Sequence, residues 1–175
     1  MRSPVQAPKT GRVAARLTRL SALFQRLTRA LDAAQPLAAL LARGYVAQVF
    51  FLSGLTKLRD WSVTLALFQD DYKVPLLPPE VAALLGTTGE LVLPVLLVLG
   101  LGGRFAALGL SVVNVVAVVS LSDIAAAALQ QHVTWGVLLG ALALYGCGKW
   151  AVDDWLLGRG SAASARPTGV HNTPA

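Results

Sequence analysis

Three polar residues stand alone inside long apolar runs and are the first candidates for chemistry. Arg43, Glu90 and Asn114 each lie well inside a mostly apolar stretch of about 20 residues, the length that crosses a bilayer. At a rise of ~1.5 Å per residue, Glu90 lies ~15 Å from one end of its stretch, and Asn114 lies at a similar depth. The long side chain of Arg43 can extend toward Glu90. We therefore predict an intramembrane cluster of Arg43, Glu90 and Asn114.

The chemistry of this cluster depends on Glu90. An ionised carboxylate at the centre of a bilayer costs at least ~2.5 kcal/mol, so the group must be paired, protonated or in contact with water. One interpretation is a proton relay, or a hydrogen-bond partner for a quinone or another substrate. The other is a structural ion pair that fixes the packing of the helices. Both stay open for Glu90, whereas a hydrogen bond between helices is favoured for Asn114.

A second set of candidates is expected where the chain leaves the membrane. Lys57 lies close to Asp60 at the end of the first apolar stretch. A short amphipathic segment follows, with Trp61 at its start and Tyr72 at its end, and His132 precedes the last apolar stretch. Amphipathic aromatic and basic side chains favour the boundary between lipid and water. We therefore predict an outer-face interface of Lys57, Trp61, Tyr72 and His132, on which a quinone headgroup or a partner protein could sit.

Few residues of this chain can bind a metal. The sequence contains one Cys, one Met and two His, which excludes a disulfide framework and an iron–sulfur cluster held by this chain alone. Cys147, Met1, His132 and His171 are scattered along the sequence, whereas a Cu(I) site needs soft ligands that converge. We predict no metal site and no intrinsic cofactor, so that redox chemistry would need a borrowed group such as a quinone.

The composition indicates an integral membrane protein. Hydrophobic residues make up 55% of the 175 residues and charged residues 14%, with a mean hydropathy of +0.60. Soluble proteins contain about 25% charged residues. The net charge of +6 is concentrated before residue 30, on a basic segment with apolar residues at helical spacing. This pattern favours a membrane surface over nucleic acid as the partner, and a disordered solvated tail and an organellar transit peptide are the alternatives.

Four apolar stretches are expected to cross the bilayer as helices, at about 37–58, 80–101, 105–122 and 133–152. We expect Pro36 to end the preceding basic helix. Between the first two spans we expect a short interfacial helix followed by a rigid strap that contains Pro75, Pro78 and Pro79. A loop at 124–132 is expected to precede the last span.

The predicted fold class is therefore all-α. It is an integral membrane four-helix bundle at 37–157, with a basic amphipathic cytoplasmic segment at 1–36 and a disordered tail at 158–175. Four spans place both termini on one side, and the excess of Lys and Arg near the termini predicts that this side is the cytoplasm. Gly136 and Gly140 form a GxxxG step, which favours packing within the bundle and leaves a homodimer as the alternative.

Several motifs, in order, resemble the DoxX family of four-helix membrane proteins. They are SGLTK (53–57), VPLLPP (74–79), GELVLPVLL (89–97), NVVAVVS (114–120) and HVTWG (132–136). The similarity covers about residues 40–155, and Arg43, Gly54, Lys57 and Glu90 occupy the positions of polar intramembrane residues of the family. The VPLLPP and HVTWG motifs are similar to those of the bufferin, or HvfX, subgroup, which is associated with the maturation of copper-binding modified peptides.

This resemblance implies a membrane subunit associated with an oxidoreductase in the bacterial inner membrane. Three functions stay open. The first is an accessory in making or handling a copper-binding modified peptide, with peptide-maturation enzymes or a redox protein as partners. The second is a small subunit of a thiosulfate- and quinone-linked oxidoreductase. The third is a non-redox transporter or scaffold.

Overall fold

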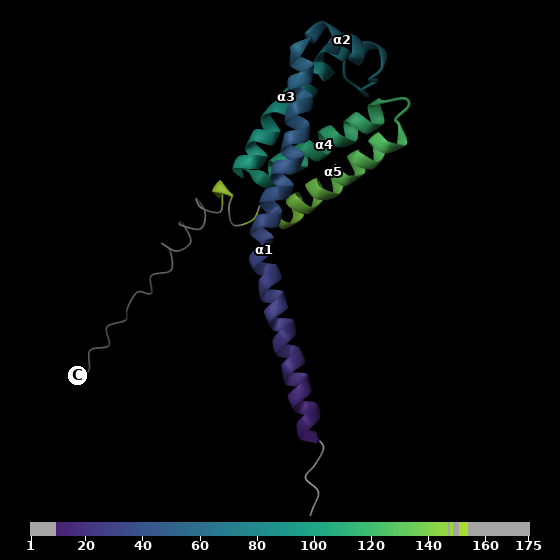
Figure 1. The fold of residues 1–175 in the computed structure, drawn as a ribbon. Helices are drawn as coiled ribbons and strands as arrows, with labels where there is room; N and C mark the ends of the chain where they lie inside the picture. Colours follow the sequence, from purple (N-terminus) through teal and green to yellow (C-terminus); the bar gives the residue numbers. More distant parts are fainter. Residues whose placement is uncertain (1–9, 147, 149–150, 154–175) are drawn as a thin grey trace, which may run out of the picture. The chain divides into compact units, whose positions relative to one another are not determined.

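The computed structural model describes residues 10–146, 148 and 151–153, with side chains from Arg19 onward (Figure 1). Within these ranges the chain forms five α-helices and no β-strand, so the all-α prediction is confirmed. Four of the helices are long and apolar enough to cross a membrane. The predicted tail at 158–175 lies outside the described residues, as do Met1, Cys147 and His171.

Helix α1 (Thr10–Arg59) contains Pro36 in its interior, so the prediction that Pro36 ends the basic helix is wrong. A proline removes one backbone hydrogen bond and disfavours a helix locally. Ala33 and Ala34 precede it and Leu37 follows it, and these residues are strong helix formers, so the helix continues through the missing bond. The chain still divides into two compact units between Gln35 and Pro36.

The part of α1 before Pro36 carries an exposed apolar stripe. Leu20, Phe24, Leu27 and Leu31 are each more than half exposed and recur at the three- and four-residue spacing of one helix face. Arg19, Arg26 and Arg29 lie on the same segment. The predicted amphipathic basic helix is therefore present, and its binding to a lipid surface stays a prediction.

Helix α2 (Trp61–Asp70) is the expected short helix after the first span, and Asp60 fixes where it begins. The Asp60 carboxylate accepts hydrogen bonds from the backbone N–H of Val63 at 3.0 Å and the hydroxyl of Ser62 at 2.7 Å. The hydroxyl of Thr64 donates to the carbonyl of Lys57 at 2.9 Å. These bonds cap the helix and tie it to the end of α1.

Replacing Asp60 with Ala should destabilise the protein at pH 7. The hydrogen bonds from Ser62 and Val63 hold the pKa of the Asp60 carboxyl below its ordinary value of 3.8. A lowered pKa stabilises the fold above that ordinary value, and the contribution is lost as the pH falls through the folded-state pKa. Thermal unfolding measures the midpoint temperatures of Asp60→Ala and wild type at pH 7 and at pH 3. The difference between the two midpoint temperatures should be smaller at pH 3. An equal difference at both values would contradict this role of the carboxylate.

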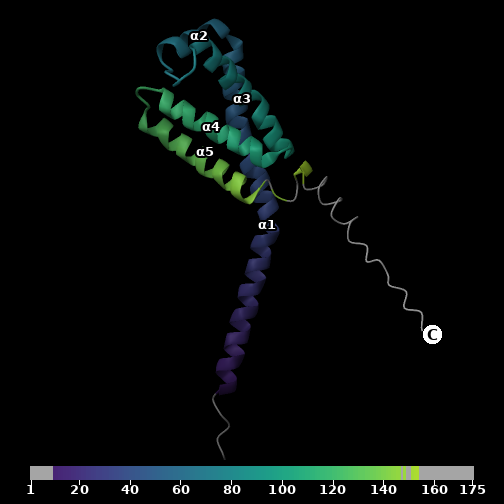
Figure 2. The same cartoon turned by 180° about the vertical axis from the view of Figure 1, so that it is seen from behind.

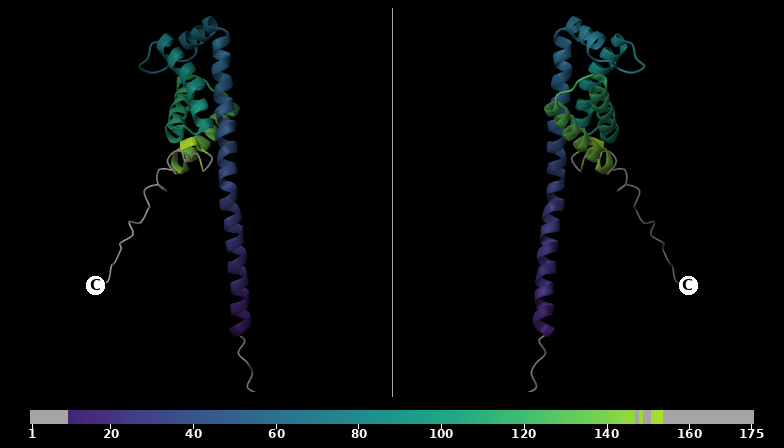
Figure 3. Two further views of the ribbon diagram at one scale, coloured as in Figure 1. Left: turned by 90° about the vertical axis from the view of Figure 1, so that its left-hand side faces the viewer. Right: turned by 90° about the vertical axis from the view of Figure 1, so that its right-hand side faces the viewer.

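Helices α3 (Pro79–Leu99) and α4 (Gly103–Ser120) form a hairpin that agrees with the second and third predicted spans. Pro94 is accommodated inside α3, as membrane helices allow. The strap between α2 and α3 is fastened to the end of α4, because the backbone N–H of Lys73 donates to the carbonyl of Ser120 at 2.9 Å. Figure 3 shows α2 and this strap at one end of the bundle.

Helix α5 (Ala126–Tyr145) begins earlier and ends earlier than the predicted span at 133–152. The prediction of a loop at 124–132 is wrong, because the run Ala126–Ala128 favours helix strongly and α5 begins there. The helix ends before Gly146 and Gly148, whose φ angles are +85° and +79°, a backbone region that glycine adopts readily. His132 therefore lies within α5.

The core of the bundle contains side chains from α1, α3, α4 and α5. Its fully buried residues include Val46, Leu97, Leu110 and Leu139. Figures 1 and 2 show α4 and α5 side by side from opposite directions, with α3 next to them. Many large apolar residues on the outside are exposed, among them Phe105, Val115, Val137 and Leu84. Such a surface suits lipid and not water.

Candidate functional site

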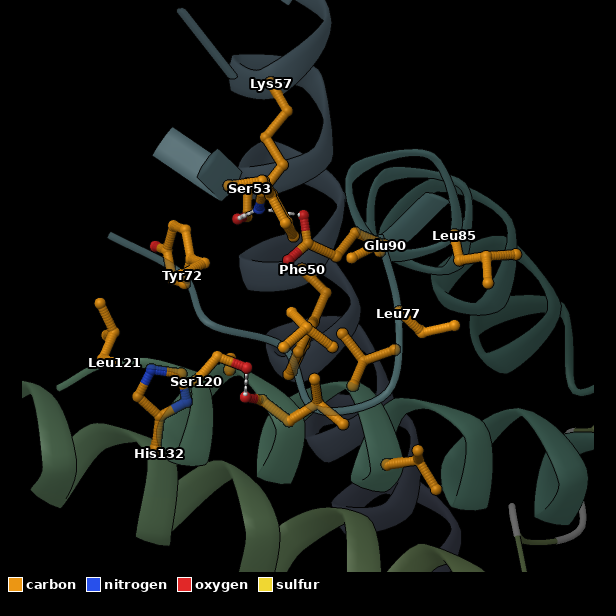
Figure 4. Close-up of a pocket in the computed structure, with 18 of the residues that line it drawn as sticks. Phe50, Ser53, Lys57, Tyr72, Leu77, Leu85, Glu90, Ser120, Leu121 and His132 are labelled. Atoms are coloured by element: carbon orange, nitrogen blue, oxygen red, sulfur yellow. Dashed lines mark hydrogen bonds and ion pairs between the residues drawn. The ribbon is translucent and has the colours of Figure 1, made fainter. Parts of the chain in front are cut away.

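A cavity of about 420 Å³ opens between the helices at the end of the bundle that carries α2. All five helices contribute to its lining, and most of the lining side chains are apolar, such as Phe50, Val116 and Trp135. Figure 4 labels Phe50, Leu77 and Leu85 among them. A small set of polar residues also lines it, namely Ser53, Lys57, Tyr72, Glu90, Ser120 and His132. An apolar pocket with a few polar groups is the usual form of a small-molecule site.

An ion pair between α1 and α3 forms one wall of the cavity. The Lys57 ammonium lies 2.5 Å from a carboxylate oxygen of Glu90 and donates to the Ser53 hydroxyl at 3.0 Å. The two charged side chains are only 18% and 9% exposed. A lysine ammonium has three N–H donors, so Ser53 and Glu90 use two of them. The third can serve a group in the cavity.

Gly54 allows α1 and α3 to approach each other beside this pair. A Cβ at Gly54 would lie 2.9 Å from the Leu91 side chain and 3.2 Å from the Cβ of Glu90, closer than such atoms normally pack. The glycine brings the helix backbones near enough for Lys57 to reach Glu90. Lys57 and Glu90 thus meet because of a packing feature that the sequence analysis did not use.

The predicted cluster of Arg43, Glu90 and Asn114 does not form. Arg43 lies 14 residues before Lys57 on α1, or ~21 Å along the helix. It is fully buried near the opposite end of α3, where a Cβ on Gly100 would lie 2.8 Å from its Nη1. Counting depth within each span did not give the stagger between the helices, so the prediction paired Glu90 with the wrong cation and placed Lys57 at the surface.

Asn114 instead joins α4 to α5. Its amide nitrogen donates to the backbone carbonyl of His132 at 2.9 Å, and its amide oxygen lies 2.8 Å from Nδ1 of the His132 ring. The ring also packs edge-on against Trp135, with centroids 4.9 Å apart. A hydrogen bond between helices was the favoured interpretation of Asn114. Its bonding to His132, which lines the cavity, was not foreseen.

Gly136 should tolerate substitution less well than Gly140, although both belong to the same GxxxG step. A Cβ at Gly136 would lie 3.3 Å from the amide nitrogen of Asn114, whereas a Cβ at Gly140 would meet no atom within 4 Å. We expect Gly140→Ala to be neutral or to stabilise by up to about 1 kcal/mol through helix propensity. Gly136→Ala should be less stable than Gly140→Ala because the new methyl group crowds the Asn114–His132 contact. Unfolding in detergent by SDS measures both, and an equal gain from the two substitutions would contradict this role of Gly136.

The predicted outer-face interface is partly brought together. Lys57, Tyr72 and His132 line the same cavity, whereas Trp61 is 39% exposed and is not among the lining residues. The Tyr72 ring packs on Phe68 at 5.1 Å. Burial and then the negative charges of Glu90 and Asp71 raise the pKa of the Tyr72 phenol. The hydroxyl therefore stays protonated at physiological pH and can donate a hydrogen bond.

Other lining residues were not predicted from the sequence, above all Ser53, Phe50 and Trp135. Ser53 precedes Lys57 by one helical turn, which is a usable signal for a shared helix face. Phe50 and Trp135 have no such signal, because apolar residues in spans do not reveal which of them face a cavity. Among the described residues, no group of three or more His, Cys, Asp or Glu side chains could hold a metal ion.

The fold and the cavity define the class of the protein. It is a small multi-pass helical membrane protein with a polar patch in an apolar pocket. Residues 38–123, just under half of the chain, match the sequence model of the DoxX family. The matched segment includes Arg43, Lys57, Glu90 and Asn114, and it extends from the apolar part of α1 to just beyond α4. No curated protein and no solved structure matches the chain.

Proposed function

We propose that this chain is a DoxX-type accessory of an oxidoreductase system in the bacterial inner membrane, with both termini in the cytoplasm. The cavity supports the redox part of the proposal, because it combines apolar walls with hydrogen-bonding groups inside the membrane domain. The motifs SGLTK, VPLLPP and HVTWG support a second part of the proposal, that the system matures or handles a copper-binding modified peptide. The partners would be peptide-maturation enzymes or a redox protein.

A quinone suits the residues that line the cavity. A volume of about 420 Å³ is within the range of small-molecule sites, which bury most of their ligand between apolar walls. The remaining N–H of Lys57 and the hydroxyl of Tyr72 can donate to carbonyl oxygens. When bound, a quinone would supply two-electron carriage between a partner enzyme and the membrane pool.

The residues of the chain would bind this ligand, orient it and keep water away. Lys57 carries a positive charge that Glu90 balances at 2.5 Å, so the pair presents a donor without a net charge. An uncharged ligand can therefore enter without an unbalanced ion in a low-dielectric site. Phe50 and Trp135, which pack edge to face at 6.0 Å, form an aromatic wall against which a flat ring can pack.

The thiosulfate-linked alternative would use the same cavity with a different electron donor, and a transporter or scaffold would not need a quinone at all. Binding of a quinone therefore separates the first two functions from the third. The first two differ in whether loss of the protein changes a modified peptide or only sulfur-dependent quinone reduction.

The proposal is tested by titrating a short-chain benzoquinone into the purified protein in lipid nanodiscs. Wild type should bind it saturably. Val116→Trp places a large ring in the cavity and should weaken binding by about tenfold or more, since even a misfit of ~1.4 kcal/mol has that effect. Val119→Trp is the matched control, because Val119 lies on the same helix but is 60% exposed. Absence of saturable binding by wild type would overturn the redox part of the proposal.

A further inference from the structure

Asn114 has only one orientation of its amide that suits its neighbours. One end of the amide lies 2.9 Å from the backbone carbonyl of His132. A carbonyl oxygen can only accept a hydrogen bond, so the NH₂ group must face it and the amide oxygen must face the imidazole. Gly136 leaves the room for this contact, because its missing Cβ would lie 3.3 Å from the amide nitrogen.

The orientation of Asn114 in turn fixes the proton on His132. The amide oxygen, which can only accept, lies 2.8 Å from Nδ1 of the ring. Nδ1 must therefore carry a hydrogen, and the neutral ring has its free lone pair on Nε2. The side-chain contacts described above place Asn114 and Trp135 around the ring, and His132 also lines the cavity.

The cavity thus has polar groups on separate walls. Figure 4 shows Lys57, Ser53 and Glu90 at one side of the apolar lining and His132 at the other. On the first wall Lys57 offers its third N–H as a donor, beside the Glu90 carboxylate, which also lines the cavity and can only accept. On the second wall the available group is an acceptor, Nε2 of neutral His132. Tyr72 carries a hydroxyl that can take either role, whereas the Ser120 hydroxyl donates to the backbone carbonyl of Val116 and can only accept from a ligand.

From this arrangement we infer that the cavity selects the hydroxyl-bearing, phenol-type form of its ligand through His132, with Asn114 as a positioning residue. A phenolic hydroxyl can donate to Nε2 of His132, while a carbonyl oxygen at the same place would meet a lone pair. The inference rests on the proposed function and adds to it that the reduced, hydroquinone-type ligand is the better bound form. A buried acceptor left without a donor costs about 1–3 kcal/mol, so the preference is measurable.

The test compares 4-hexylphenol with its methyl ether 4-hexylanisole, in which a methyl group replaces the hydroxyl hydrogen so that the oxygen can no longer donate. Each is titrated into the protein in nanodiscs at pH 8, where an unperturbed His (pKa about 6.5) is neutral. Wild type should bind the phenol about tenfold more tightly than the ether, the equivalent of ~1.4 kcal/mol. His132→Phe should reduce this ratio to about one. Gln131→Ala, an exposed neighbour on α5, should retain it.

A second measurement observes the His132 ring itself, first in the wild-type protein. The chain has two His residues, so ¹⁵N-imidazole NMR spectra of wild type and His171→Ala resolve the ring of His132. The signals should show a protonated Nδ1 and an unprotonated Nε2, and addition of the phenol should shift Nε2. Asn114→Leu should redistribute the tautomers and lower the phenol preference together.

The outcomes separate this inference from the proposed function. Equal binding of phenol and ether, or a protonated Nε2 in the neutral ring, would overturn the role of His132 and leave the cavity as a ligand site. No binding of either probe, together with no binding of the benzoquinone, would overturn both. A phenol preference that disappears in His132→Phe and persists in Gln131→Ala would support the inference.

Discussion

Lys57→Met should lower the free energy of unfolding by about 3–5 kcal/mol, the cost of removing one partner from a buried ion pair. The substitution leaves the Glu90 carboxylate, which is 9% exposed, without its counter-ion. It also removes the donor to Ser53. The double substitution Lys57→Met with Glu90→Gln should recover most of the loss, because it removes both charges and keeps the approximate volumes.

Reversible unfolding by SDS in mixed micelles measures these free energies for wild type, both single variants and the double variant. Lys73→Met is the control, since Lys73 is exposed and precedes α3 on the strap. It should change stability by less than about 0.5 kcal/mol, as surface substitutions usually do. A double variant as unstable as Lys57→Met would show that the charge balance is not what stabilises this contact.

Gly100→Ala should destabilise the protein by about 2–5 kcal/mol, from backbone strain of about 1–2 kcal/mol and from overpacking of about 1–3 kcal/mol. Gly100 ends α3 with φ at +71°, where a side chain is disfavoured. A Cβ there would lie 2.7 Å from the Cα of Ala151 and 2.8 Å from Nη1 of Arg43. Ala151 cannot retreat easily, because the backbone N–H of Asp153 donates to the Gly100 carbonyl at 3.2 Å.

Gly102→Ala separates the two contributions. Gly102 also has a positive φ, +55°, but a Cβ there would meet no neighbouring atom closer than 3.9 Å. Only the strain of about 1–2 kcal/mol should remain. The same SDS unfolding experiment compares the two variants. Equal losses would mean that the fit of Arg43 and Ala151 around Gly100 contributes nothing measurable.

Much of the fold was predictable from the sequence because apolar runs of sufficient length have few alternatives to a membrane helix. Helices α3 and α4 agree with the predicted spans within about two residues, the usual uncertainty of helix ends. The predictions failed where local signals were weighed wrongly. Pro36 was given more weight than the helix-favouring residues around it. The alanine-rich first turns of α5 were assigned to a loop.

Most polar residues of the candidate site could be predicted from the sequence, but which of them contact each other could not. Lys57, Glu90, Asn114, Tyr72 and His132 were all candidates, because isolated polar residues in apolar runs are easy to recognise. Which of them meet depends on the stagger between helices, and this is fixed by close packing at Gly54 and Gly136, where missing Cβ atoms permit contact. Neither glycine reveals its partner in the sequence.

We proposed above that the cavity serves an oxidoreductase system that matures a copper-binding modified peptide. The most direct test is mass spectrometry of small Cys-containing peptides from cells in copper excess, with and without this protein. We predict that removing the protein changes the modification pattern of such a peptide, and that Val116→Trp reproduces the change while Val119→Trp does not. An identical pattern with and without the protein would contradict the claim.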